Sequence, residues 1–373
     1  MRVSSVTAHR VRIPFKAVFA HALHSRRVAE PIVLVIESES GHIGVGEVLP
    51  RSYLTGETLE SASQKEIPAL VRRWFGCSFE GCSEVVDALR EELQFTGSAL
   101  ATFAGWELAV LDMAGKAFGF AAGDVVGPAA GRDLEPGVVI DFGVPTHGLE
   151  KHCMLLRLAG RRHVKVKVGL DDDLHRLTVV QDVFGVDHAL RLDANGVWTA
   201  DYAIEMLKQM RRFNIRSIEQ PVPPRDLAGM RRVQEESGVP VVADESLCTL
   251  DDGQRLIAAH AADIFNIRMA KCGGFLACLR LVKLANEAGL GCQLGTLVGE
   301  TGILSRAAEI FGRRVEGFEF LEGKGQNKLL LVKDIVEPVP PREGLGVAIA
   351  SNSLDHWAVC TPTVFKAPQR RPI

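Results

Sequence analysis

Long hydrophobic runs are missing from this sequence. No apolar stretch approaches the roughly 20 residues that a membrane-spanning helix requires. Residues 1–15 alternate apolar and polar side chains, which predicts a strand rather than the uninterrupted apolar segment of a signal peptide. We therefore expect no membrane partner and a cytoplasmic location.

Neither sign of charge is in clear excess. The 373 residues contain 43 Lys and Arg against 46 Asp and Glu, which gives a net charge of −3. Such a balance supplies no general field to attract nucleic acid, and no basic stripe is interleaved with aromatic residues. We expect no nucleic-acid partner, so specificity has to come from a local site.

Closely spaced cysteine pairs are also missing. None of the eight cysteines forms a Cys-x-x-Cys motif, which argues against zinc ribbons and dithiol redox motifs. The sequence has no evident disulfide framework of a secreted protein. We expect reduced and mostly buried thiols.

The sequence does contain enough apolar residues for a large core, at 47% against 24% charged residues. Up to about residue 125 it mixes strand and helix patterns, which predicts an α+β domain over residues 1–125. Ser40-Gly41 and Gly44-Val45-Gly46 predict turns within this part. The expected strands cover residues 3–13 and 32–38, and the expected helices cover residues 57–74, 84–95 and 98–118.

Eight short apolar segments then alternate with amphipathic stretches. Strands separated by helices predict a parallel sheet, and eight of them at even spacing predict a closed barrel of the TIM type. We assign residues 126–325 to this α/β barrel and residues 326–373 to a C-terminal segment that packs back on the first domain. The eight segments are VVIDF, HVKVKV, ALRLDAN, IRSIEQP, PVVADES, DIFNIRMAK, GCQLGT and GFEFLEG.

A polar residue recurs near the carboxyl end of five successive predicted strands. The residues are spaced 26, 26, 25 and 27 positions apart, one strand-helix unit each time. The carboxyl end of the strands holds the active site in this architecture, so we expect these side chains to meet there. They are Lys167, Asp193, Glu219, Asp244 and Lys271.

Three of these five residues are acidic and predict a metal site. Asp193, Glu219 and Asp244 each follow an apolar run, where a charge is costly unless it is paired or bound to a cation. Oxygen ligands suit Mg²⁺, and the absence of His or Cys at these positions argues against zinc. A single acid could instead cap a following helix, but three in register favour Mg²⁺, with Mn²⁺ as the alternative ion.

The lysines predict acid–base chemistry. Lys165 and Lys167 lie two residues apart on one strand, so both point into the barrel. Buried unpaired lysines are strongly disfavoured, which favours a functional role over salt bridges in a polar barrel. Burial and a neighbouring cation both lower the pKa of a lysine, which makes a free amine available as a base. Lys271 comes about four strands later and approaches from the opposite side.

Together these residues suit removal of the proton next to a carboxylate. The doubly charged enediolate that forms needs a divalent cation where its charge develops, and a lysine takes the proton. This pairing of a lysine base with Mg²⁺ is similar to the known chemistry of the enolase superfamily.

At this point the chain resembles the enolase superfamily over nearly its whole length, and specifically the muconate-lactonizing subgroup of the mandelate racemase/muconate lactonizing enzyme family. The resemblance implies an α+β capping domain over a modified (β/α)7β barrel. It rests on the motifs Lys165-Val166-Lys167, Asp193-Ala194-Asn195, Glu219-Gln220-Pro221, Asp244-Glu245-Ser246 and Lys271-Cys272-Gly273-Gly274, with Gly44-Val45-Gly46-Glu47 and the helix containing Ala104, Glu107 and Asp112 in the first domain.

The resemblance also implies roles for the site residues. Lys167 and Lys271 would be the acid–base pair. Lys165 would lower the pKa of Lys167 and contact the substrate carboxylate, while Asn195 and Glu245 would support the metal ligands. A small carboxylate substrate and a homo-oligomeric assembly are implied as well.

The substrate-binding residues are expected in several loops. Residues 50–58 resemble a specificity loop of the epimerases, and Arg51, with Arg26 and Arg27, is a candidate for binding a second substrate carboxylate. The eighth predicted strand carries a lone Glu319, a pattern more similar to that of the cycloisomerases. Dipeptide epimerases usually carry Asp-x-Asp on this strand. Glu300 is a further candidate for the pocket.

We therefore expect a Mg²⁺-dependent isomerase similar to muconate cycloisomerase, with a dipeptide epimerase or N-acylamino acid racemase as the alternative. Outside this class, a lysine could form a Schiff base in a lyase or aldolase. Three in-register acids argue against that, because a Schiff base needs no metal. A barrel without catalysis, serving as a binding protein, would be supported by loss of one of these residues, but all are present.

Overall fold

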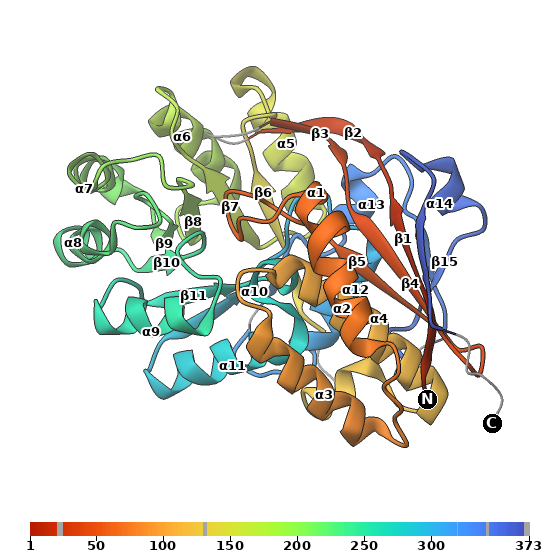
Figure 1. Ribbon diagram of the computed structural model, residues 1–373. Helices are drawn as coiled ribbons and strands as arrows, with labels where there is room; N and C mark the ends of the chain where they lie inside the picture. Colours follow the sequence, from red (N-terminus) through yellow and green to blue (C-terminus); the bar gives the residue numbers. More distant parts are fainter. Residues whose placement is uncertain (21–24, 130–132, 319, 341–342, 369–373) are drawn as a thin grey trace, which may run out of the picture.

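A computed structural model describes residues 1–20, 25–129, 133–318, 320–340 and 343–368. The chain forms a sheet-and-helix domain at one side and a barrel at the other (Figure 1). Among the described residues, no helix combines the length and apolar character needed to cross a membrane.

The first domain is built on a four-stranded antiparallel sheet. Its order is β16-β1-β4-β5, so the last strand of the chain lies beside the first. A separate hairpin joins β2 (Ile13–Ala20) to β3 (Ser25–Ala29). The strands of the sheet are β1 (Val3–Arg10), β4 (Ile32–Ser38), β5 (Ile43–Val48) and β16 (Thr363–Lys366).

The turn predicted at Gly44–Gly46 is wrong, because these residues lie inside β5. Both glycines are needed there for packing. A Cβ atom on Gly44 would lie 2.0 Å from the carbonyl oxygen of Ala109, and one on Gly46 would lie 1.9 Å from that of Gly105. Glycine in this strand therefore marks the close approach of a helix rather than a bend.

That helix is α4 (Leu100–Phe118), which is buried along almost its whole length against the sheet. Its composition explains this, since most of its residues are apolar or small, with Glu107 and Asp112 as buried acids. The other elements of the domain are α1 (Leu59–Ser61), the π-helical turn η1 (Ala62–Glu66), α2 (Ile67–Trp74), α3 (Cys82–Phe95) and η2 (Ala122–Val125). The three helical stretches predicted from spacing are present within a few residues.

The second domain is a closed barrel of parallel strands, as predicted. The order around the barrel is β10-β11-β12-β13-β6-β7-β8-β9. Short apolar strands buried on both faces explain the continuous apolar runs of the sequence. The strands are β6 (Glu135–Ile140), β7 (His163–Lys167), β8 (Leu190–Asp193), β9 (Ile215–Glu219), β10 (Val241–Ala243), β11 (Ile264–Ile267), β12 (Gly291–Leu294) and β13 (Phe320–Glu322).

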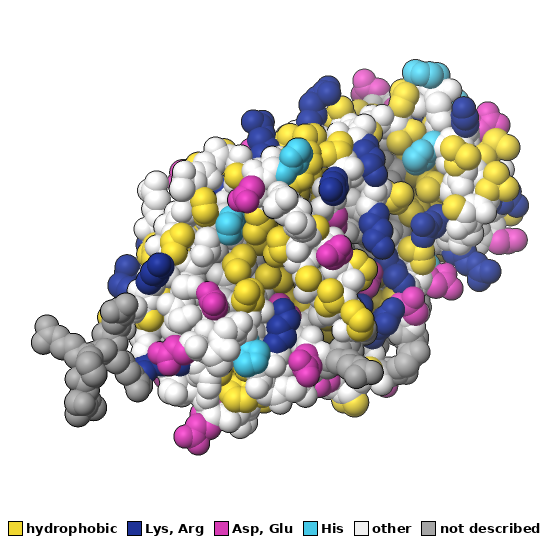
Figure 2. Space-filling model, turned by 90° about the vertical axis from the view of Figure 1, so that its right-hand side faces the viewer, with side chains coloured by type: hydrophobic (Ala, Val, Ile, Leu, Met, Phe, Trp, Pro, Cys, Tyr) yellow, Lys and Arg dark blue, Asp and Glu magenta, His cyan; other side chains and the backbone are white. Residues whose placement is uncertain are grey.

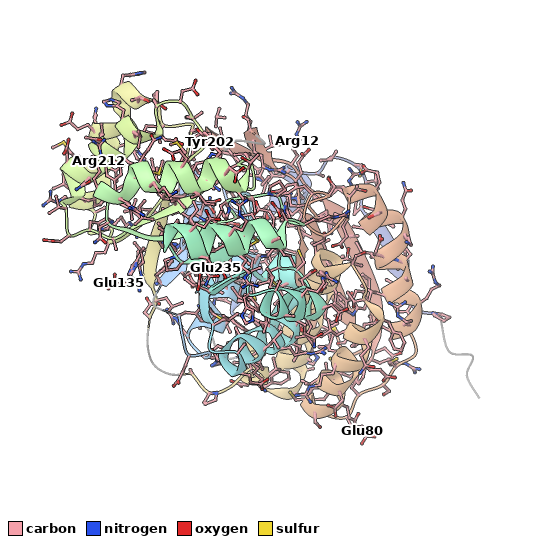
Figure 3. The ribbon with its side chains drawn as sticks, turned by 90° about the vertical axis from the view of Figure 1, so that its left-hand side faces the viewer. Arg12, Glu80, Glu135, Tyr202, Arg212 and Glu235 are labelled. Atoms are coloured by element: carbon pink, nitrogen blue, oxygen red, sulfur yellow. The ribbon has the colours of Figure 1, made fainter. Side chains whose placement is uncertain are left out.

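Amphipathic helices cover the outside of the barrel. In α7, for example, Ala203, Ile204 and Leu207 face inward, while Tyr202 lies on the outer surface (Figure 3). The helices are α5 (Thr146–Leu158), α6 (Asp173–Phe184), α7 (Ala200–Gln209) followed by η3 (Met210–Arg212), α8 (Leu227–Ser237), α9 (Leu250–Ala258), the single turn α10 (Met269–Cys272), α11 (Gly274–Glu287) and α12 (Gly302–Gly312).

The C-terminal segment returns to the first domain. It contains α13 (Gln326–Leu330), β14 (Val336–Pro338), β15 (Val347–Ile349) and α14 (Ser353–His356), and its last strand pairs antiparallel with β1. The last described strand therefore lies beside the first strand of the chain. The face shown in Figure 2 carries charges of both signs among apolar side chains. The domain boundaries at residues 125 and 325 stay predictions.

Candidate active site

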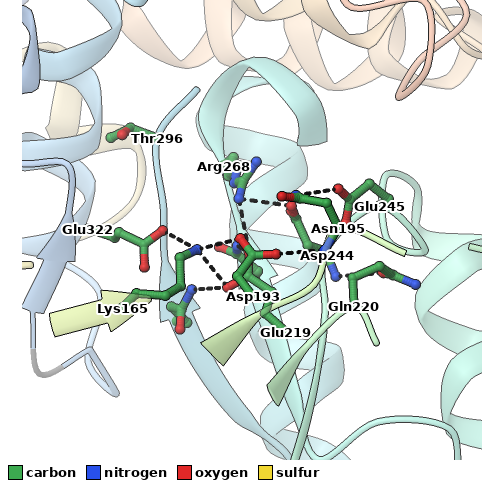
Figure 4. A network of polar contacts seen from close by, with 12 residues as sticks. Lys165, Asp193, Asn195, Glu219, Gln220, Asp244, Glu245, Arg268, Thr296 and Glu322 are labelled. Atoms are coloured by element: carbon green, nitrogen blue, oxygen red, sulfur yellow. Dashed lines mark hydrogen bonds and ion pairs between the residues drawn. The ribbon is translucent and has the colours of Figure 1, made fainter. Parts of the chain in front are cut away.

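The acidic residues predicted to meet do follow neighbouring strands at one end of the barrel. Asp193 ends β8 and Glu219 ends β9, and the two are direct partners in the strand register. Asp244 follows β10 immediately. All three side chains are at most 1% exposed. Figure 4 shows them side by side within one network of polar contacts.

Two lysines of β7 pair with these acids. Lys165 Nζ lies 3.0 Å from Asp193 Oδ2, 3.0 Å from Glu219 Oε2 and 2.6 Å from Glu322 Oε1. Lys167 Nζ donates to Asp193 Oδ2 at 2.5 Å and to Asn195 Oδ1 at 2.7 Å. Both lysines point into the barrel, as the alternation along the strand predicted.

Burial was expected to lower the pKa of lysines inside the barrel, but at Lys165 and Lys271 the neighbouring carboxylates raise it. Burial disfavours the charged form of Lys165, but Asp193 and the two glutamates around it outweigh burial, so its pKa is raised. Burial also opposes the charge of Lys271, and Asp244 again raises the pKa above its usual value.

Lys271 approaches the acids from the other side of the barrel. Its neighbouring strand β11 lies four positions from β7 in the closed order, which places the two lysine segments opposite each other. Lys271 itself lies in α10, beyond the end of β11, and not at a strand end as predicted. Its Nζ donates to Asp244 Oδ1 at 3.0 Å and to the carbonyl oxygens of Asp244 and Asn266.

Arg268 is a member of the site that the sequence reading missed. Its Nη2 lies 3.1 Å from Glu219 Oε1 and 2.8 Å from Asp244 Oδ2, so it joins two of the acids. Burial opposes ionisation of Asp244, yet Arg268 and Lys271 lower its pKa. For Glu219 burial is not fully offset by Lys165, and the nearby acids add to it, so the pKa is raised to about 7.

Glu322 is a second residue of the site that was not predicted from the sequence. Lys165 binds one of its carboxylate oxygens, and Arg191 Nη1 lies 2.8 Å from the other. Arg191 could have been found, because it precedes Asp193 by two residues, as Lys165 precedes Lys167. The predicted Glu319 lies outside the described residues.

Tight turns after the strands carry the supporting polar residues. Asn195 has a backbone φ of 48° and Gln220 one of 40°, values that Asn and other polar residues adopt more readily than β-branched ones. Asn195 links Lys167 to Glu245, since its Nδ2 donates to Glu245 Oε1 at 3.0 Å. Gln220 Oε1 accepts from the backbone N–H groups of Asp244 and Ser246.

A pocket opens above this network and reaches the first domain. About 620 Å³ of space, open solvent at the mouth included, lies between the barrel and the first domain, which forms a cap over this end of the barrel. Arg26 and Arg51 line it on the cap side, with Phe19 and Tyr53 beside them. Its barrel side is formed by Val139, Lys165, Lys167, Asn195, Glu245, Arg268, Thr296, Leu297, Val298, Glu322, Gly323 and Gln326.

Only some of the predicted substrate-binding residues line this pocket. Arg51 is buried at the wall of the pocket and donates to the carbonyl oxygen of Val298 at 2.8 Å. Burial, together with Arg26, lowers the pKa of Arg51 to about 10. Glu300 does not line the pocket; it is buried behind it, where it accepts from Leu297 N at 2.6 Å. Arg27 is exposed on the opposite face of β3 from Arg26.

The ligand atoms of Asp193, Glu219 and Asp244 are of the type that a hard divalent cation prefers, but the three side chains are not arranged around one ion position. The donors are all oxygen, and Glu245 Oε2 is buried without a hydrogen-bond partner among the described residues. However, no three Asp, Glu, His or Cys side chains of the described chain converge on one ion position. Lys165 joins Asp193 to Glu219 instead, and Arg268 joins Glu219 to Asp244.

A parallel barrel with acids at the carboxyl ends of its strands, and with lysines on opposite sides of those acids, characterises one class of barrel enzymes. Comparison with known proteins identifies that class. Residues 149–352 match the family model described as Enolase C-terminal domain-like. That match covers more than half of the chain, so the chain belongs to this family and to the enolase superfamily, as the sequence motifs predicted.

The curated relatives are isomerases. The chain is 29% identical to a hydrophobic dipeptide epimerase of Enterococcus faecalis, over 83% of this chain and 86% of the relative. It is 26% identical to the N-succinyl-L-Arg/Lys racemase of Bacillus cereus and to muconate cycloisomerase 1 of Pseudomonas putida, in both cases over 96% of this chain and 98% of the relative. The chain is therefore an isomerase of the enolase superfamily.

Solved structures agree with the fold. The N-succinyl Arg/Lys racemase of Bacillus cereus superposes with a TM-score of 0.86 at 23% identity, covering 98% of this chain and 100% of that one. The dipeptide epimerase of Enterococcus faecalis, solved with Mg and the dipeptide L-Leu-L-Tyr, gives a TM-score of 0.82 at 23% identity, covering 93% and 100%.

Proposed function

We propose that this protein is a Mg²⁺-dependent racemase or epimerase of N-acylated amino acids that carry a second carboxylate. The observation that carries the proposal is the placement of Lys167 and Lys271 at opposite sides of one acidic cluster. A proton can leave a carbon atom toward one amine and return from the other, which inverts that carbon.

The contacts of the two lysines support acid–base roles for both. Lys167 is held at the β7 side by Asp193 and Asn195, and its amine lines the pocket. Lys271 is held by Asp244 on the far side. We assign proton removal from one enantiomer to Lys167 and from the other to Lys271, with proton return by the opposite lysine.

The predicted magnesium ligands would be Asp193, Glu219 and Asp244, with Asn195 and Glu245 supporting them. The ion, when bound, supplies positive charge beside the substrate carboxylate, where negative charge grows as the proton leaves. Lys165 and Arg268 line the same pocket and add fixed positive charge there.

The two arginines on the cap side support a second substrate carboxylate. Arg26 and Arg51 line the same pocket as Lys167, and guanidinium groups suit carboxylate oxygens. On the barrel side Glu322 already binds Lys165 and Arg191 with its two oxygens. A substrate ammonium group would have to compete with those two cations, which favours an acylated amino group over a free one.

A second candidate is the muconate cycloisomerase predicted from the sequence. Its substrate also carries two carboxylates, and the two arginines would suit the second one equally well. The relatives include a cycloisomerase as well as epimerases and racemases, so they support the isomerase class without choosing between these substrates.

The test is a substrate panel in D₂O with Mg²⁺. N-succinyl amino acids, N-acetyl amino acids, dipeptides and cis,cis-muconate are each incubated with the enzyme, and deuterium at the α-carbon is followed by NMR. We expect uptake with loss of optical rotation, strongest for N-succinyl compounds. Lactone formation from muconate would favour the cycloisomerase. Activity that survives chelator together with borohydride trapping of a carbonyl substrate would overturn both and favour the Schiff-base lysine enzyme.

A further inference from the structure

The segment that carries Lys271 is a short buried turn between β11 and α11. Lys271 is the third residue of α10, which is a single helical turn. Gly273 and Gly274 follow with φ values of 90° and 83°, and α11 starts at Gly274. One turn is not stable in isolation, because helix formation has a costly nucleus. The position of Lys271 therefore depends on what holds the two ends of this segment.

A buried carboxylate of the capping domain holds the far end. Glu107 of α4 accepts from the backbone N–H of Phe275 at 2.5 Å and from that of Leu276 at 3.1 Å. These are the first N–H groups of α11, which have no partner inside the helix. Glu107 is completely buried, so no water competes for these bonds.

The second glycine of the Lys-Cys-Gly-Gly motif is explained by this contact. A Cβ atom on Gly274 would lie 2.1 Å from Glu107 Oε2, which leaves no room for any side chain. The left-handed backbone of both glycines turns the chain so that the N–H groups of α11 face the carboxylate. Residues three to five positions after Lys271 are thus fixed by the other domain.

The matching glutamate of the cap holds a different barrel helix. Glu47 of β5 accepts from Thr301 N at 2.9 Å, from Thr301 Oγ1 at 2.7 Å and from Leu304 N at 3.1 Å, at the start of α12. It is also fully buried. Both glutamates join the cap to the barrel by the same chemistry, but Glu107 alone of the two holds the helix that follows Lys271.

We infer that Glu107 is a positioning residue for Lys271, acting through the N-terminus of α11. The inference rests on the proposed acid–base role of Lys271. Loosening this contact shifts the α10 turn and displaces the amine from its place beside Asp244, while Lys167 on β7 keeps its own contacts. Misplacement of a reacting group by about 1 Å can cost about 100-fold in rate.

Loss of this contact should impair proton transfer by Lys271 and leave proton transfer by Lys167 intact. The measurement that separates the two lysines is exchange of the substrate α-proton with solvent. Racemisation rates in the two directions are tied by an equilibrium constant of one, so they fall together whichever lysine is disturbed. Exchange of the α-proton with solvent deuterium, with retention of configuration, reports on each lysine separately. Each enantiomer loses its proton to the lysine on its own side.

The experiment compares Glu107→Gln with Glu47→Gln in full-length enzyme loaded with Mg²⁺. We expect Glu107→Gln to slow exchange of one enantiomer, the one whose exchange is lost in Lys271→Ala, by at least about 10-fold, and the other by less than about 3-fold. Glu47→Gln changes both enantiomers by the same factor. Should Glu107→Gln fail to fold, Glu107→Asp takes its place, with a smaller but equally one-sided effect.

Equal slowing of both enantiomers in Glu107→Gln would overturn the inference and leave Glu107 a structural residue only. Slowing of the Lys167 side instead would overturn it as well. Absence of exchange for both enantiomers in the wild-type enzyme contradicts the proposed function itself, so the two failures are distinguishable.

Discussion

Lys165 binds Glu322 inside the barrel, with 2.6 Å between Nζ and Oε1. The pair joins β7 to β13, and Arg191 binds the second oxygen of the same glutamate at 2.8 Å. Glu322 is thereby the centre of a buried charge network that extends to the predicted metal ligands Asp193 and Glu219 through Lys165. This arrangement makes β13 part of the site's electrostatic balance.

We predict that Glu322→Gln destabilises the fold and lowers activity. Removal of one partner from a buried ion pair leaves the cations Lys165 and Arg191 partly uncompensated, at a cost of about 3–5 kcal/mol. The free energy of unfolding from urea titration measures this. The control is Asp201→Asn, which removes an exposed partner of Arg232 and should change stability by less than about 1 kcal/mol. Equal effects of the two variants would contradict the prediction.

We predict that the two pocket arginines select substrates with a second carboxylate. Arg51→Ala and Arg26→Ala should each raise KM for an N-succinyl amino acid by about 10-fold or more, the effect of losing a charge-assisted hydrogen bond of about 1.5–3 kcal/mol. For an N-acetyl amino acid KM should change little. Arg27→Ala is the matched control, because Arg27 neighbours Arg26 but is exposed outside the pocket. A shift of KM in all three variants alike would refute this assignment.

The close approach of β5 to α4 gives a stability prediction. Gly46→Ala places a methyl group 1.9 Å from the carbonyl oxygen of Gly105, so the strand and helix must move apart. Overpacking of this kind costs about 1–3 kcal/mol, measured by thermal or urea unfolding. The comparison is Gly148→Ala in α5, where the nearest atom to the new methyl is at 3.8 Å. That variant should be neutral or stabilised by up to about 1 kcal/mol.

The buried cap glutamates give a pH dependence with a definite sign. Burial raises the pKa of Glu47 from 4.5 to about 7, although hydrogen bonds from Thr301 and Leu304 oppose it. The folded protein therefore holds a proton that the unfolded chain has released. The stability that Glu47 contributes is complete below about pH 4.5 and is lost as the pH rises toward about 7.

Comparison of wild type with Glu47→Gln isolates this contribution, since other buried acids affect both proteins. We expect the free energy of unfolding to fall more steeply between pH 5 and 7 in wild type than in the variant, by about 1.4 kcal/mol for each unit of pKa shift at most. Parallel curves would show that Glu47 does not titrate in this range.

The sequence was sufficient to predict the barrel and its row of acids, because one strand-helix unit repeats with nearly constant length from Lys167 to Lys271. It was insufficient where the strands are very short. Phe318–Gly323 has apolar residues on both faces, so alternation could not tell whether Glu322 or Glu319 faces the interior.

The remaining errors have physical causes in tertiary contacts. Gly44 and Gly46 were predicted to form a turn, since glycine favours turns, but they serve the packing of α4, which no local pattern reveals. Arg268 was missed because only its neighbours Glu219 and Asp244, from other strands, make it part of the site. Lys271 was predicted to lie on a strand, but it lies in the single turn α10. The Gly-Gly pair that follows this turn packs against Glu107 of the other domain, a contact that no local pattern reveals.

The most direct test of the account is α-proton exchange in D₂O with Lys167→Ala and Lys271→Ala, measured separately on each enantiomer of an N-succinyl amino acid with Mg²⁺ present. We predict that each variant loses exchange of one enantiomer, and that the two variants lose opposite ones, while inversion is abolished in both. Loss of exchange of the same enantiomer in both variants, or wild-type exchange in either, would contradict the assignment of the two lysines to opposite sides of the reacting carbon.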